Sequence, residues 1–229
     1  MTGGVVPLLV LDHLVLAAAT LAQGRDWCDA TLGIQPDAGG RHALMGTHNL
    51  VFAIGSSRFP RAYFEIIAID PEAPAPPHAR WFDLDDAALQ RALGRGPQLV
   101  HWVARCESID AARAVLLAEG IEGGEPRQAE RMTPQGLLRW RIGVRSDGHR
   151  PLGGAAPALI EWGDRHPTDA MPASGVTLQA MRVAGWPAAL TAALPVAIER
   201  DPRAEAPPIS VTLACAHGLV SLETPDLEA

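Results

Sequence analysis

Two histidines and two glutamates recur along this chain in the same order. His13 and Glu65 come first, followed by His101 and Glu161, each within a short apolar run typical of a buried strand. A polar side chain in such a run is costly to bury unless a partner satisfies it. Imidazole and carboxylate groups together suit a divalent metal, and Zn²⁺, Ni²⁺, Mn²⁺ and Fe²⁺ all fit that donor set. We therefore predict one shared site in which these four residues bind a metal ion.

Each of the four residues also has a simpler interpretation. A lone histidine in a strand is as often a hydrogen-bonded core residue as a metal ligand, and a strand glutamate usually faces water. The repetition of the same two residue types in the same order favours the metal site over these readings.

Other side chains near these strands are candidates for binding a substrate. Arg139 and Arg141 alternate with apolar residues, and a guanidinium group pairs well with a carboxylate or phosphate. Trp102, Trp140 and Trp162 could form the wall of a pocket, and Asn49 lies in or beside a turn between strands. The alternatives are a solvated strand face for the arginines, core packing for the tryptophans and turn capping for Asn49.

The strands that carry these residues belong to a repeated pattern of one strand, one helix and three further strands. Turn residues separate three copies, which we place at 8–94, 98–168 and 175–224. The third copy is divergent, lacks the histidine, and is expected to cover a sheet edge or to build a subunit interface.

The residues 37–40 are predicted as a turn. The apolar face of the strand at 137–144 is predicted to pack on a helix, with its arginines on the other face.

Composition restricts the class of protein. The chain has 229 residues and a formal net charge of −7, which argues against nucleic acid or an anionic membrane as the main partner. No apolar run reaches about 18 residues, and residues 1–7 lack the basic start of a signal peptide. The three cysteines form no CxxC motif, so we expect a cytoplasmic protein with free thiols. All 19 basic residues are arginine, which excludes Schiff-base chemistry on a lysine of this chain.

Several short motifs resemble a known family. The segments 11–16, 39–42, 46–49 and 64–67 are similar to the glyoxalase-like domain of the vicinal oxygen chelate superfamily, and 159–167 resembles the second half of the same bacterial family. The resemblance implies an α+β fold in which tandem βαβββ modules form a cupped mixed sheet around a cleft, with a partial third unit at the C-terminal end.

The resemblance also implies a site and a class of reaction. In the glyoxalase I branch, the first and fourth strands of each module supply the metal ligands, which correspond here to His13, Glu65, His101 and Glu161. The implied activity is that of a divalent-metal-dependent lyase or isomerase on a small α-oxygenated carbonyl compound. The metal would act as Lewis acid and Glu161 as base.

Two other functions stay open. The first is a metal-free protein that binds or sequesters a small molecule, as some members of the superfamily do. The second, an iron-dependent ring-cleaving dioxygenase, fits less well because that chemistry takes two histidines and one carboxylate. The expected partner is a small molecule, and a homodimer would be one use of the third unit.

Overall fold

The computed structural model describes residues 9–203 and 205–227. The segment 1–7 and the expected boundary at residue 8 lie outside these residues. An eight-stranded sheet is built from β1 (Val10–Ala17), β2 (Asp37–His42), β3 (Thr47–Ala53), β4 (Tyr63–Ile69), β5 (Gln98–Arg105), β6 (Glu125–Thr133), β7 (Gly136–Val144) and β8 (Ala158–Trp162). A four-stranded sheet is built from β9 (Thr177–Ala184), β10 (Glu199–Asp201), β11 (Ile209–Cys215) and β12 (Gly218–Glu223). The α-helices are α1 (Leu21–Leu32), α2 (Ala87–Leu93) and α3 (Ile109–Ala118).

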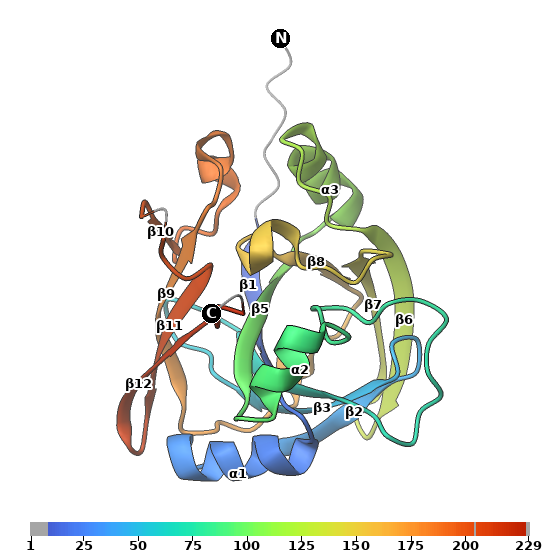
Figure 1. Ribbon diagram of the computed structural model, residues 1–229, viewed down its shortest axis with the longest axis vertical. Helices are drawn as coiled ribbons and strands as arrows, with labels where there is room; N and C mark the ends of the chain where they lie inside the picture. The colour runs from blue at the N-terminus through green and yellow to red at the C-terminus, as the bar shows by residue number, and fades with distance from the viewer. Residues whose placement is uncertain (1–8, 204, 228–229) are drawn as a thin grey trace.

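The large sheet joins two βαβββ modules along their first strands. Its order is β2-β3-β4-β1-β5-β8-β7-β6, with β1 parallel to β4, antiparallel to β5, and β5 parallel to β8. The sheet curls, and β2 and β6, its two edge strands, turn toward each other (Figure 1). This confirms the α+β fold class and the cupped mixed sheet predicted from the sequence.

Helices α1 and α3 begin at the capping residues that the sequence predicts, and α1 ends at the predicted glycine. The Thr20 side chain accepts a hydrogen bond from the backbone N–H of Gln23 at the start of α1, and Gly33 ends that helix in the left-handed conformation. Ser108 caps α3 through the backbone N–H of Ala111. Helices α1 and α3 pack into the core on the convex side of the sheet, whereas Leu89 and Leu93 of α2 belong to the core on the concave side.

The third unit covers the convex face of the central strands. Its apolar residues share one core with β1, β4 and β5, and Leu178 at the start of β9 donates a backbone hydrogen bond to the Ile54 carbonyl. The unit follows the expected order, except that the expected helix is a 3-10 segment, Ala188–Ala193. It therefore packs on the sheet rather than extending it.

Two local predictions were wrong. Residues 37–40 are part of β2, where a register shift against β3 falls between Ala38 and Arg41. The apolar face of β7 lines the concave side of the sheet, and on the other face Arg141 pairs with Asp110 of α3. In the part of the chain that the structure describes, no helix is long and apolar enough to cross a membrane.

A substitution at Trp102 tests how the third unit is attached to the large sheet. Its ring is fully buried against Trp186, and its indole N–H donates to the Ala155 carbonyl oxygen. We expect Trp102→Ala to lower the free energy of unfolding by about 3–5 kcal/mol because it leaves a large cavity. The control Leu219→Ala removes a side chain that is 73% exposed and should change stability by less than about 0.5 kcal/mol. Urea denaturation measures both, and equal effects would contradict the packing described.

Candidate functional site

The concave face of the large sheet contains two adjoining cavities. The inner one is small, about 50 Å³, and is lined by polar side chains of β1, β3 and β4 and by several aromatic rings. The outer one has a volume of about 560 Å³ and lies between β2, β6 and the segment after β8. Arg131 and Met171 line both cavities, so the inner cavity adjoins the outer one at these side chains.

A β-bulge in β1 brings Asp12 and His13 onto the same side of the sheet. Leu11 pairs with Ala104 of β5, whereas His13 pairs with Val103, so Asp12 has no counterpart. Arg105 donates a hydrogen bond to the Leu11 carbonyl oxygen at this irregular point. As a result, the His13 ring Nδ1–H can donate to Asp12 Oδ1 at 2.7 Å, although the two residues are neighbours in a strand.

Glu65 faces the other nitrogen of His13. The parallel pairing of β1 with β4 brings Glu65 Oε2 to 3.5 Å from His13 Nε2. Glu65 Oε1 accepts a 2.5 Å hydrogen bond from the Asn49 amide, whose own oxygen accepts the backbone N–H of Gly40. A side chain at Gly39 would collide with that amide. The glycines at the β2 irregularity therefore make room for Asn49, and Asn49 orients Glu65.

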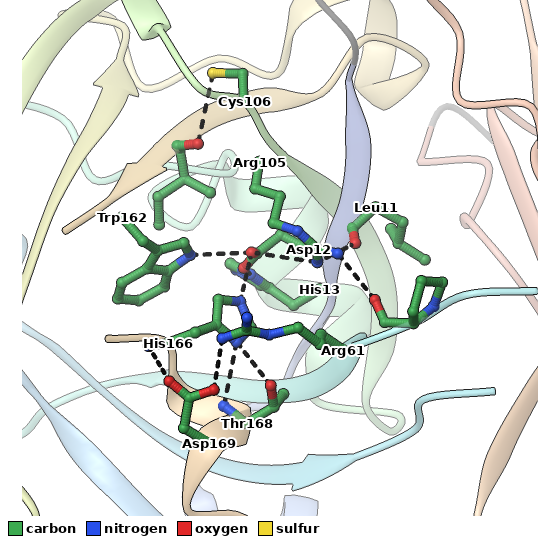
Figure 2. A network of polar contacts seen from close by, with 12 residues as sticks. Leu11, Asp12, His13, Arg61, Arg105, Cys106, Trp162, His166, Thr168 and Asp169 are labelled. Carbon is green, nitrogen blue, oxygen red and sulfur yellow. Dashed lines mark hydrogen bonds and ion pairs between the residues drawn. The ribbon is translucent and has the colours of Figure 1, made fainter. Parts of the chain in front are cut away.

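Asp12 also connects the two modules. Its Oδ2 accepts hydrogen bonds from the Trp162 indole N–H at 3.0 Å and from His166 Nε2 at 2.9 Å (Figure 2). His166 Nδ1 accepts the backbone N–H of Thr168, which places the imidazole proton on Nε2. Asp12 is thus a fully buried carboxylate with donors from β1, β8 and the turn after β8.

The network sets the charges at the inner cavity. Burial alone would lower the pKa of His13, but the hydrogen bonds to Asp12 and Glu65 outweigh it and raise that pKa to about 9. Burial alone would raise the pKa of Glu65, but the contacts with His13 and Asn49 lower it to about 2. Burial lowers the pKa of the nearby His42 to about 4. At neutral pH the site therefore holds an imidazolium between two carboxylates, beside a neutral histidine.

His101 lies on the concave face but not beside His13. Across the β1–β5 pair, His101 faces Val15, and Val103 faces His13. The His101 Nε2 accepts the backbone N–H of Ala158 at 3.0 Å, and its ring packs against Phe82. Burial lowers the pKa of His101 well below its usual value, so the ring is neutral.

Glu161 lies on the opposite side of the sheet. Its carboxylate accepts the backbone N–H of Ile109 at the start of α3, at 2.8 Å, and lies 3.4 Å from Arg141. The register explains this placement. In the first module, Glu65 pairs with Val15, which is two residues after His13. In the second module, the equivalent residue is Ala158, which pairs with Val103, two residues after His101. Glu161 is three residues beyond Ala158, an odd number, and its side chain points away from the cleft.

The four predicted ligands are therefore not brought together. Only His13 and Glu65 meet, because His101 gives its Nε2 lone pair to a backbone amide and Glu161 caps a helix. Among the described residues, no group of three or more histidine, cysteine, aspartate or glutamate side chains is placed to hold a metal ion. The donor set does not fit the four-ligand centre implied by the resemblance.

The predicted substrate-binding residues are also divided between the two faces of the sheet. Trp162 lines the inner cavity and Asn49 lies beside Glu65, whereas Trp102 belongs to the core on the other face. Arg139 is exposed and paired with Glu130, and Arg141 is paired with Asp110 on the convex side.

Sequence reasoning did not identify Asp12, His166 or Arg131. A signal for Asp12 exists, because Leu9 and Leu11 share a core with Leu14 and Leu16. That switch from odd to even positions requires an irregularity in β1 near residue 12. No comparable pattern marks His166 or Arg131.

The raised pKa of His13 predicts a pH dependence of stability. A group whose pKa is higher in the folded state stabilises fully below its ordinary value of 6.5, and this stabilisation is lost as pH rises through about 9. We expect the free energy of unfolding of the wild type to fall over this interval relative to His13→Gln. Urea denaturation across the interval measures it, and parallel curves for the two proteins would contradict the assignment.

Substitutions at Glu161 and Glu65 should have different effects: the first should lower stability, and the second should change the environment of His13. Glu161→Ala removes an acceptor at the start of α3 and should cost about 0.5–1.5 kcal/mol of stability. It should leave the imidazole resonances of His13 in an NMR spectrum unchanged. Glu65→Gln should shift those resonances, because it removes the carboxylate 3.5 Å from Nε2. A shift of the His13 signals in Glu161→Ala would place Glu161 in the site after all.

Comparison with known proteins identifies the family. The model of a glyoxalase-like domain matches residues 11–197. The chain is similar to the crystal structure of a hypothetical protein from Staphylococcus aureus, with 16% identity, a TM-score of 0.55, and 96% of this chain and 87% of that chain covered.

Two methylmalonyl-CoA epimerases are also similar. The enzyme from Streptomyces coelicolor, in complex with 2-nitronate-propionyl-CoA, has 18% identity, a TM-score of 0.41, and 67% of this chain and 97% of that chain covered. The enzyme from Mycobacterium tuberculosis has 18% identity, a TM-score of 0.40, and 74% and 97% covered. No curated protein matches. With its matching domain model and its paired βαβββ modules, the chain belongs to the glyoxalase-like domain family of the vicinal oxygen chelate superfamily.

Proposed function

We propose that this protein is an isomerase or lyase that moves a proton on a small α-oxygenated carbonyl compound in the inner cavity. The observation that carries the proposal is the arrangement of Asp12, His13 and Glu65, in which one acid and one base meet at the inner cavity. Isomerisation and elimination next to a carbonyl both require such a pair.

The two groups have complementary roles. Glu65 is the base that removes the proton next to the carbonyl group. The His13 Nε2–H hydrogen-bonds to the carbonyl oxygen and stabilises the negative charge that develops there. Asp12 keeps His13 protonated and oriented through Nδ1.

The low pKa of Glu65 belongs to the site without substrate. It depends on the contact with His13. A carbonyl oxygen that takes the Nε2–H of His13 would weaken this contact, and the pKa of Glu65 would rise toward that of a useful base. The bound substrate would thus activate Glu65.

No step of this proposal uses a metal ion. The sequence implied a four-ligand centre, but His13 and Glu65 supply only two of its four donors. Metal dependence is therefore an outcome that the experiment must test separately. The homodimer and the cytoplasmic location stay predictions.

A second function is a metal-free protein that binds a small molecule without turnover. The feature that favours it is the aromatic lining of the inner cavity by Trp81, Trp140 and Trp162. Flat rings would contact one end of a planar ligand, and the rest of that ligand would lie in the outer cavity of about 560 Å³.

Proton exchange distinguishes the two functions. Incubation in D₂O with α-hydroxy aldehydes, α-hydroxy ketones and hemithioacetals should replace the hydrogen next to the carbonyl of a substrate by deuterium, as followed by NMR. We expect His13→Gln and Glu65→Gln to slow this exchange by about 10²–10⁴-fold. Glu161→Gln is the matched control and should exchange at the wild-type rate.

The metal content of the samples is varied in the same experiment. Exchange that survives a chelator supports the metal-free mechanism, and exchange that needs added Zn²⁺, Ni²⁺ or Mn²⁺ contradicts it. Binding of these compounds without exchange would favour the sequestering protein.

A further inference from the structure

Arg131 stands at the junction of the two cavities. It lies on β6, the edge strand of the second module, and lines both the inner and the outer cavity. Its guanidinium group lies against Gly40 of β2, where any Cβ atom would collide with Nη1. The side chain therefore crosses from one edge of the curled sheet to the other at the entrance to the inner cavity.

This guanidinium group has no anionic partner. Its Nε is buried without a hydrogen-bond acceptor. Among the described residues, no carboxylate lies within 4.0 Å of it, whereas Arg139 and Arg141 are both ion-paired. A cation held in a cavity wall without a counter-charge is poised to take an anion from outside.

An acidic substrate needs such a cation because the inner cavity has no spare positive charge. Asp12 and Glu65 carry two negative charges, which His13 and Arg105 balance, with Arg105 Nη1 4.0 Å from Asp12 Oδ2. An anionic group entering beside Glu65 would therefore have no counter-charge there. Arg131 offers that charge where β6 meets Gly40 of β2.

We propose that Arg131 binds an oxyanion group of the substrate, a carboxylate or a phosphate, while the carbonyl end of the same molecule reaches His13 and Glu65. This inference rests on the proposed function for the role of the carbonyl end. The outer cavity, at about 560 Å³, has room for the rest of a molecule much larger than the inner cavity holds.

Binding tests this assignment without any turnover. The ligands are lactate, its uncharged amide lactamide, and inorganic phosphate, and calorimetric titration measures the affinity of each. We expect the wild type to bind lactate or phosphate at least about tenfold more tightly than lactamide. Arg131→Gln should abolish this preference, and Arg131→Lys should restore it in part, because lysine keeps the charge but not the planar fork.

Arg139→Gln is the matched control, since it removes an exposed arginine of the neighbouring strand and should keep the preference. Lactate binding without phosphate binding identifies the group as a carboxylate, and the reverse identifies it as a phosphate. Equal affinity for lactate and lactamide in the wild type, absence of binding, or a preference that survives in Arg131→Gln would overturn the assignment. Absence of proton exchange in the wild type, with its binding preference intact, would instead count against the proposed function alone.

Discussion

The buried carboxylate of Asp12 is the interaction on which the site depends. A fully buried charge costs several kcal/mol unless donors surround it, and Asp12 has three, from His13, Trp162 and His166. These donors come from both modules, so the carboxylate fixes how the β8 end of the second module meets β1. The bulge at Asp12 also brings its buried carboxylate against His13, whose ring faces Glu65. One irregularity in one strand therefore sets the orientation of His13 and the acceptor that holds the Trp162 indole.

The two modules share a fold but not a chemical role. In the first, the histidine on the leading strand meets a glutamate on the fourth. In the second, the equivalent histidine is occupied by the Ala158 amide, and the position equivalent to Glu65 is Ala158 itself. Glu161 has become part of the structure of α3. The first module thus places a charged histidine and a carboxylate at the inner cavity, whereas the second places a neutral His101 against Phe82.

The sequence predicted the large features because they depend on repeated local patterns. Alternating apolar residues and helix caps such as Thr20 and Gly33 predicted the order of strands and helices, and the family resemblance implied the α+β cupped sheet; the meeting of His13 with Glu65 followed from their strands. Glu161 was placed in the site wrongly because the sequence of a fully apolar strand does not show which of its side chains face the cleft. A shift of the strand by an odd number of residues turns each side chain to the opposite face. Arg131 could not be found, since its position opposite Gly40 depends on how far the sheet curls, which no local pattern records.

The charges of the inner cavity explain how this fold could host the proposed chemistry with a donor set other than two histidines and two glutamates. A divalent ion in such a cleft would neutralise the carboxylates around it and stabilise a developing oxyanion. Here the positive charge between two carboxylates is the His13 imidazolium, which carries a proton as well as a charge. In the proposed reaction it would stabilise the oxyanion and also protonate it. It offsets one of the two carboxylates, and Arg105, with Nη1 4.0 Å from Asp12 Oδ2, offsets the other. These charges balance within the buried network and leave none for an anionic group of a substrate, which is the role that the proposal gives to the unpaired guanidinium of Arg131.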